Sequence, residues 1–201
     1  MDRRNALKKI GLGSGAITIS PLVVGIFQSC KSNNKLFNPV NFSRDEFYII
    51  SKLMELIIPK TEIPGAIDLK LPKFLDGYMT LVMSNNEKNK ILNGLKYFIE
   101  ILKDKSNGKE ISEIKFEDIE IQLKKYFFAD QKEIKIFNKD LNSKESIAYN
   151  FLVELRSFTI DAFKTNEFIG EKILAYDPNP NGRKVCVDLI KTTKGKGWSL
   201  F

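Results

Sequence analysis

The side chains available for chemistry in this sequence are mainly carboxylates and lysines, because the chain contains no histidine and only two cysteines. Histidine supplies the usual ligands of zinc and haem and the base of a Ser-His-Asp triad, so these sites are excluded. Two cysteines are too few for an iron–sulfur cluster. The sequence therefore predicts no catalytic, cofactor-binding or metal-binding residue in this chain.

Four carboxylates crowd into one short stretch: Glu113, Glu117, Asp118 and Glu120. Lysines alternate with them, and this mixture is typical of the solvated face of an amphipathic helix. Acid–base catalysis by paired carboxylates requires a pocket that separates their pKa values. An enzyme that uses only Asp, Glu and Lys is therefore an alternative. A closed pocket that holds carboxylates with shifted pKa values would favour it.

Two further acidic residues, Asp76 and Asp161, have apolar neighbours within predicted helices. Each is expected to cap a chain end or to pair, since neither has a nucleophile or base nearby in sequence. The glycine run "GLGSG" at 11–15 follows no predicted strand, so it lacks the strand–turn–helix context of a phosphate-binding loop. Glycines 182, 195 and 197 are interpreted as surface turns.

The full chain has 201 residues and a formal net charge of +7. Basic and acidic residues are interspersed, as in "KDKSNGKEISEIKFEDIEIQLKK", so no nucleic-acid partner is expected. The length suits one domain with its own core. Abundant phenylalanine and helical periodicity predict an all-α, single-domain bundle of about five or six helices with a loop-rich C-terminal segment.

Apolar residues at helical spacing define the predicted helices. Ser43 and Glu46 form an S-x-x-E capping box at the start of the first, which Pro59 ends. The second begins at Pro72 and has Phe74, Leu75, Tyr78 and Val82 on one side. Further helices are expected at 86–104, 115–128, 144–164 and 166–176, and a short strand at 185–189. The stretch 129–137 either extends the fourth helix or forms a separate one.

The N-terminus has the pattern of an export signal, predicted to span residues 1–29. Arg3, Arg4, Leu7 and Lys8 give R-R-x-x-L-K, which resembles the twin-arginine export signal. The charge-free stretch that follows contains four glycines and Pro21, so it is only mildly hydrophobic. A permanent transmembrane anchor is the alternative, because the run approaches the roughly 20 residues that span a bilayer.

The stretch "FQSC" ends this segment and resembles a relaxed bacterial lipobox. Cleavage before Cys30 would leave an acylated first residue, and its acyl chains would supply a stable membrane anchor on the periplasmic side of the envelope. Residues 30–42 would then be a tether. The alternative is a plain cysteine near a signal-peptidase site, in which case a disulfide to Cys186 is conceivable. Cys186 has valine on both sides and is expected to be buried.

Two loop motifs follow helices in the remaining domain, residues 43–201. One is "IIPKTEIPGA" at 57–66, and the other runs from "LAYDPNPNG" at 174–182 to "GWSL" at 197–200. Loops rich in Pro, Gly and aromatic residues can present a binding surface, although they can also simply terminate helices. Together with the twin-arginine pattern, these motifs resemble the gluconate 2-dehydrogenase subunit 3 family, the small subunit of membrane-associated flavin dehydrogenases.

The resemblance implies a non-catalytic accessory subunit. In that family the partner is a flavoprotein of the glucose–methanol–choline type that carries FAD, and a cytochrome c subunit often takes the electrons. The small subunit is thought to assist folding of the flavoprotein and to carry it through the twin-arginine export machinery, which moves folded proteins. A stand-alone envelope lipoprotein that binds a ligand or an envelope component is the alternative.

The partner-binding residues expected from the resemblance lie in the two loop motifs. They are Pro59, Thr61, Pro64, Gly65, Ala66, Tyr176, Asp177, Pro178 and Trp198. Tyr176 and Trp198 are the expected anchors, since these residue types dominate binding hot spots. An obligate interface of about 2,000 Å² or more is expected.

Overall fold

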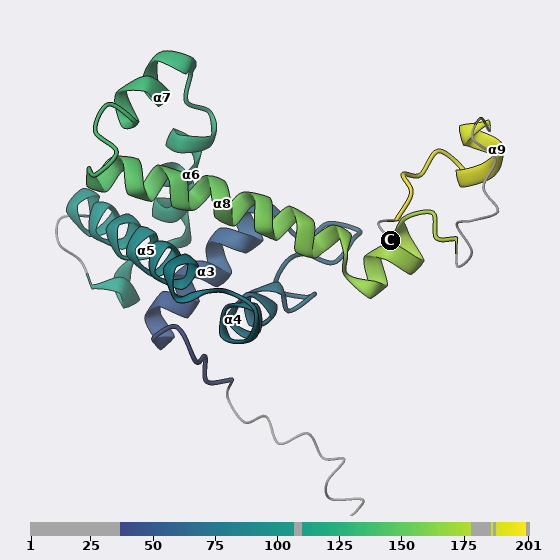
Figure 1. The fold of residues 1–201 in the computed structure, drawn as a ribbon, viewed down its shortest axis with the longest axis horizontal. Coiled ribbons are helices and arrows are strands. Elements are labelled where there is room, and N and C mark those ends of the chain that lie inside the picture. The colour runs from purple at the N-terminus through teal and green to yellow at the C-terminus, as the bar shows by residue number, and fades with distance from the viewer. Residues whose placement is uncertain (1–36, 107–109, 178–185, 187, 200–201) are drawn as a thin grey trace, which may run out of the picture. The chain divides into compact units, whose positions relative to one another are not determined.

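The computed structural model describes residues 37–106, 110–177, 186 and 188–199 (Figure 1). The chain divides into a first unit, Met1–Asn38, and a second, Pro39–Phe201, and all described helices lie in the second. The predicted signal residues Arg3, Arg4, Leu7 and Lys8, the predicted lipidation site Cys30, and Pro178 lie outside the described residues.

The second unit is built from helices, which confirms the all-α prediction. In chain order they are α3 (Arg44–Ile57), α4 (Leu71–Leu81), α5 (Asn85–Lys105), the 3₁₀ turn η1 (Ile111–Glu113), α6 (Phe116–Phe127), α7 (Gln131–Phe137), α8 (Lys144–Lys164), the π-helix η2 (Ile169–Ile173) and α9 (Leu189–Thr193).

Local capping fixes where several helices begin. The predicted capping box of α3 is confirmed: Glu46 N–H donates to the Ser43 hydroxyl, and the Glu46 carboxylate accepts from Ser43 N–H. The same reciprocal pattern starts α5 at Ser84 and α7 at Asp130. The Asp130 cap makes α7 a separate helix, because Asp130 itself has an extended backbone that interrupts the helical path after α6.

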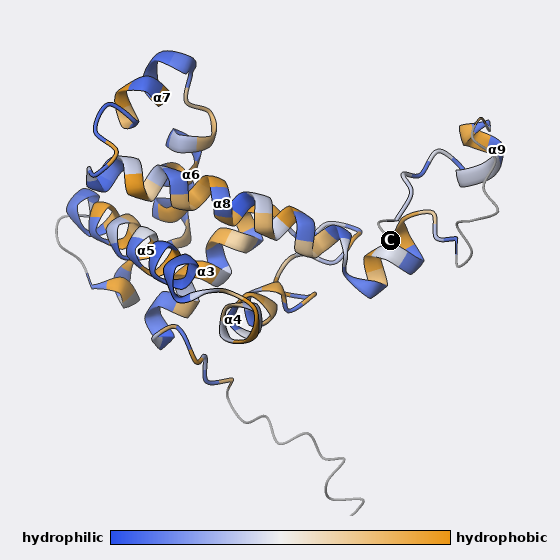
Figure 2. Ribbon diagram, viewed as in Figure 1, coloured by the Kyte–Doolittle hydropathy of each residue, from blue (hydrophilic) through white to orange (hydrophobic). Residues whose placement is uncertain are grey.

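The two longest helices, α5 and α8, lie side by side and form the centre of the core (Figure 1). Gly94 on α5 permits their close approach, since a Cβ at this position would lie 2.2 Å from the Cβ of Phe151 on α8. Apolar residues recur along both helices in Figure 2, as expected for helices with one buried face. Helix α3 packs against α4, α6 and α8 and buries Ile49, Ile50, Leu53 and Met54.

A buried carboxylate fixes the segment that leads into α3. Asp76 on α4 is 2% exposed and accepts from Val40 N–H at 2.9 Å and Asn41 N–H at 2.9 Å. The Asn41 side-chain amide also donates to the Asp76 carboxylate and to the Thr80 hydroxyl. Asp76 therefore clamps residues 40 and 41 against α4, before the Ser43 cap of α3. Phe42, which follows, is buried in the core.

The chain after α8 departs from two expectations. The sixth helix, predicted at 166–176, is instead the shorter π-helix η2. The strand predicted at 185–189 is wrong at residues 188 and 189, which the structure describes as the start of a helix. Asp188 caps α9 by accepting from Lys191 N–H at 2.9 Å, so Leu189 is helical. The expectation that Cys186 is buried is also wrong, because this cysteine is exposed.

Candidate partner-binding site

The first loop motif is held in shape by Glu55, in the last turn of α3. Its carboxylate accepts from the backbone N–H groups of Lys60, at 3.2 Å, and Ile67, at 2.8 Å. Ala66 N–H donates to the carbonyl of Ile58, so the loop closes back on the end of the helix. These bonds satisfy backbone groups that the helix end and the turn would otherwise leave unpaired.

Gly65 is required by this arrangement. A Cβ there would lie 2.6 Å from the backbone N of Lys60 and 2.7 Å from the Glu55 carboxylate. Ala66 is fully buried, whereas Pro59 and Thr61 are exposed and Pro64 is half-buried. Gly65 and Ala66 therefore shape the loop, and the surface that it offers comes from Pro59, Thr61 and Pro64.

Sequence reasoning missed Glu55, although a signal for it exists. An acidic side chain in the last turn of a helix faces the negative end of the helix dipole, which is unfavourable without compensation. Two backbone N–H donors provide that compensation here.

The second loop motif is tied together by an isolated parallel bridge between Ala175 and Trp198. Ala175 N–H donates to the carbonyl of Gly197 at 2.9 Å, and Ser199 N–H donates to the carbonyl of Ala175 at 3.0 Å. Tyr176 is half-exposed next to this bridge, and Trp198 is half-buried within it. The structure thus joins the two halves of the second motif, while separate hydrogen bonds hold the first.

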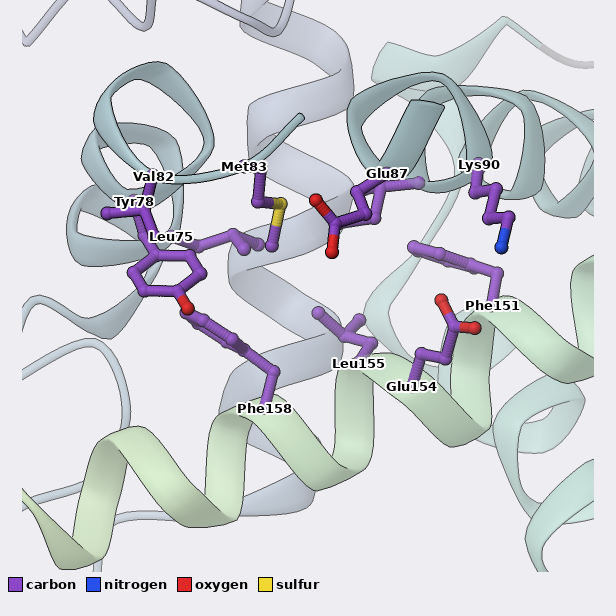
Figure 3. A pocket seen from close by; sticks show the side chains of 11 residues that line it. Leu75, Tyr78, Val82, Met83, Glu87, Lys90, Phe151, Glu154, Leu155 and Phe158 are labelled. Atoms are coloured by element: carbon purple, nitrogen blue, oxygen red, sulfur yellow. The ribbon is translucent and has the colours of Figure 1, made fainter. Parts of the chain in front are cut away.

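A groove of about 410 Å³ lies between α4, α5 and α8 (Figure 3). Its walls are mostly apolar, and three charged side chains, Glu87, Lys90 and Glu154, line one part of it. Leu75 and Tyr78 line it from α4, Val82 lies at its edge just after α4, and Leu155 and Phe158 line it from α8 (Figure 3). Below, this cavity is called the α4–α8 groove.

Of the four apolar residues that the sequence places on one side of the second helix, Leu75 is buried, whereas Phe74 and Val82 are not. Phe74 is half-exposed and Val82 is 62% exposed, whereas Leu71, Leu75 and Met79 are buried. The apolar face of this helix is broad, so periodicity alone does not decide which part of it meets the core.

The carboxylate-rich stretch is a solvated face, as predicted. Glu113 and Glu117 are exposed, Asp118 accepts from Lys115 N–H at the start of α6, and Glu120 pairs with Lys124 at 2.7 Å. Each described carboxylate whose pKa is clearly shifted has the pKa lowered. Hydrogen bonds from Ser84 lower the pKa of Glu87, and a hydrogen bond from Lys144 lowers the pKa of Glu100.

Burial raises the pKa of Tyr126, the phenol most strongly affected. Its ring packs edge-on against Phe137, with centroids 5.4 Å apart, and also lies near Tyr149. These contacts join α6, α7 and α8 in an aromatic cluster. Tyr126 does not line the α4–α8 groove, so its role in this arrangement is packing.

Within the described residues, no group of three or more Cys, Asp or Glu side chains could hold a metal ion. None of the described helices combines the length and the apolar character that crossing a bilayer requires.

Comparison with known proteins gives one family match. The sequence profile of the family described as Gluconate 2-dehydrogenase subunit 3 matches residues 44–182, which run from the start of α3 past η2 into the second loop motif. No curated protein and no solved structure matches the chain.

Proposed function

The chain belongs to the gluconate 2-dehydrogenase subunit 3 family, and from this premise we propose that it is the non-catalytic accessory subunit of an exported, FAD-dependent sugar or alcohol dehydrogenase. Its partner is a flavoprotein of the glucose–methanol–choline type, which carries FAD and the redox chemistry. The accessory subunit assists folding of the flavoprotein, takes it through the twin-arginine export machinery and attaches it to the periplasmic face of the membrane through Cys30.

The family match is the observation that supports this proposal, because it covers the helices from α3 to η2 and the first loop motif. The N-terminal pattern of Arg3 and Arg4 adds a physical reason for the export role. Twin-arginine transport moves folded proteins, and a flavoprotein must bind FAD in the cytoplasm before it leaves. A bound partner with the export signal can therefore carry a folded flavoprotein that has none.

Three of the described helix starts do not suit the diphosphate of FAD. A dinucleotide places its phosphates on free N–H groups at a helix N-terminus, behind a glycine-rich turn. The starts of α3, α5 and α7 are instead capped by Ser43, Ser84 and Asp130, and each has a glutamate at its third position. These carboxylates would repel a phosphate at those three positions. The proposal assigns FAD to the partner because the family places it in another subunit.

The test is purification of the tagged full-length protein from its native envelope in mild detergent, with the copurified material scanned for flavin absorbance. A stoichiometric flavoprotein whose own sequence lacks an export signal is expected. A solitary, colourless protein would overturn the proposal and favour the stand-alone lipoprotein.

Export and anchoring are tested separately. Replacing Arg3 and Arg4 by lysine is expected to leave both this chain and the flavoprotein in the cytoplasm, while Lys9→Arg, outside the R-R-x-x-L-K pattern, serves as the control. Cys30→Ala is expected to abolish acylation and membrane attachment. Continued membrane retention of Cys30→Ala, with the N-terminus intact, would support the transmembrane anchor instead.

A further inference from the structure

We propose that the α4–α8 groove receives an apolar segment of the flavoprotein partner that carries a lysine or arginine at one end. This inference rests on the proposed function, since it names the surface by which the accessory subunit holds the flavoprotein. It places the main contact on α4 and α8, outside both loop motifs.

The first argument is that the apolar face of α4 is wider than the part buried in this chain. Leu71, Leu75 and Met79 face the core of this chain. Phe74, Tyr78, Leu81 and Val82 continue this face at helical spacing as an adjoining stripe, and Leu81 is 85% exposed. The apolar face of α4 is therefore wider than the part that the core of this chain covers, while Lys73, Asp76 and Thr80 lie on the opposite side. A partner that covers the exposed part would complete the burial of this face.

The second argument is that the groove beside this stripe is concave and already formed. The rings of Phe74 and Phe158 stack with centroids 5.9 Å apart, and the ring of Tyr78 lies 5.4 Å from Phe158. These contacts tie α4 to α8 before any partner arrives. Rigid aromatic walls lower the entropy lost on binding, and a volume of about 410 Å³ accepts inserted side chains.

The third argument is charge. Two carboxylates, Glu87 and Glu154, line the groove with one lysine, Lys90, so its rim is acidic in a chain with a net charge of +7. Ser84 holds the Glu87 carboxylate through its N–H at 2.8 Å and its hydroxyl at 2.7 Å. Glu154 has no ion-pair partner among the described residues. A cationic side chain at one end of an apolar segment complements this rim.

A second hollow, of about 310 Å³, provides a useful comparison. It lies between α3, α6 and α8, next to the first loop motif. Its rim charges are already engaged: Lys124 pairs with Glu120 at 2.7 Å, and the Arg156 guanidinium lies 5.0 Å from the centre of the Phe127 ring. Of these two hollows, the α4–α8 groove is the one with a lining carboxylate, Glu154, that has no ion pair within the described residues.

The direct experiment is site-specific photocrosslinking in the complex of full-length protein and flavoprotein. A photoreactive phenylalanine analogue replaces Val82 at the groove or, as the control, Leu141, which is 68% exposed in the turn before α8. An adduct to the flavoprotein is expected from position 82 and not from position 141. The crosslinked peptide, identified by mass spectrometry, is expected to be apolar with a lysine or arginine.

Substitution provides an independent readout. Leu81→Lys and Glu154→Lys are each expected to weaken flavoprotein binding about tenfold or more, because one charges the apolar stripe and the other removes the acidic rim. The controls Leu141→Lys and Glu117→Lys make the same chemical changes at exposed positions outside the groove. Unchanged circular dichroism and melting temperature show that each variant folds.

The outcomes separate the two proposals. If wild-type protein binds no flavoprotein, the proposed function fails. If wild-type protein binds flavoprotein but the groove variants bind equally well, or adducts form only from the control position, the groove inference is overturned and the proposed function stands. A small organic molecule that occupies the groove in purified protein, without a crosslink from position 82, likewise overturns the inference.

Discussion

Replacing Asp76 by asparagine tests whether the buried clamp organises the start of the helical body. In the wild type, the carboxylate accepts from the N–H groups of Val40 and Asn41, both at 2.9 Å, and from the Asn41 side-chain amide at 3.1 Å. An asparagine has one acceptor oxygen. It can keep the contacts with Asn41, but its NH₂ group then faces the Val40 N–H, donor against donor.

The magnitude follows from the bonds lost. A hydrogen bond to a charged acceptor contributes about 1.5–3 kcal/mol, and the variant loses one such bond and weakens the others, so the free energy of unfolding should fall by about 2–4 kcal/mol. For a domain of this size, that corresponds to a melting temperature lower by about 5–15 °C. Thr80→Val is the matched control. It removes an exposed hydroxyl from the same network and should cost less than about 1 kcal/mol.

The assay combines urea unfolding with amide hydrogen exchange of the purified protein. In the variant, the amides of Val40 and Asn41 should exchange much faster than in wild type, while amides in the centre of α5 stay protected. A loss of stability below about 1 kcal/mol, with slow exchange retained at both positions, would refute the reasoning that Asp76 anchors this segment.

Gly94→Ala should lower the free energy of unfolding by about 1–3 kcal/mol or more in urea unfolding, because its Cβ would lie 2.2 Å from a side-chain atom on α8; wild-type stability would contradict the close approach of α5 and α8. Gly65→Ala should destabilise by a similar amount, while its control Gly77→Ala, with no atom within 4 Å, should be neutral or stabilising by up to about 1 kcal/mol. Hydrogen bonding between Glu100 and Lys144 lowers the pKa of the carboxyl and raises that of the ammonium. The pair therefore stabilises from above the ordinary carboxyl pKa to beyond the ordinary lysine pKa, and it is lost as pH falls through the lowered value. At neutral pH, the melting temperature of Glu100→Gln should accordingly be lower than that of wild type. At strongly acid pH the two melting temperatures should be equal, and a difference that persists there would exclude the ion pair as its cause.

Helix positions were largely predictable because their causes are local. The Ser43–Glu46 box acts over three residues, and the apolar spacing of the stretches at 86–104 and 144–164 is a property of each segment alone. The end of the chain was harder to predict. The valines beside Cys186 in the sequence indicate a buried cysteine only if the segment packs against a core, and Cys186 is exposed.

Of the candidate site, the sequence indicated the first loop motif but not the reason for its shape. The roles of Glu55 and Gly65 depend on contacts that reach from position 55 to position 67, outside any helical or strand period. The α4–α8 groove was not predictable at all, since its residues come from three helices and meet only when these pack.

The sequence by itself determined that this chain forms helices, where most of them begin, and that it lacks histidine chemistry. Only the tertiary structure decided which part of the apolar face of α4 meets the core. That face is broader than the core covers, so the local free energy of burial does not select one part of it. The choice was made by Asp76, which needs the backbone N–H groups of residues 40 and 41, and by the rings of Tyr78 and Phe158, which meet across two helices. Those partners are distant in sequence, and their pairing leaves Leu81 and Val82 exposed beside the groove.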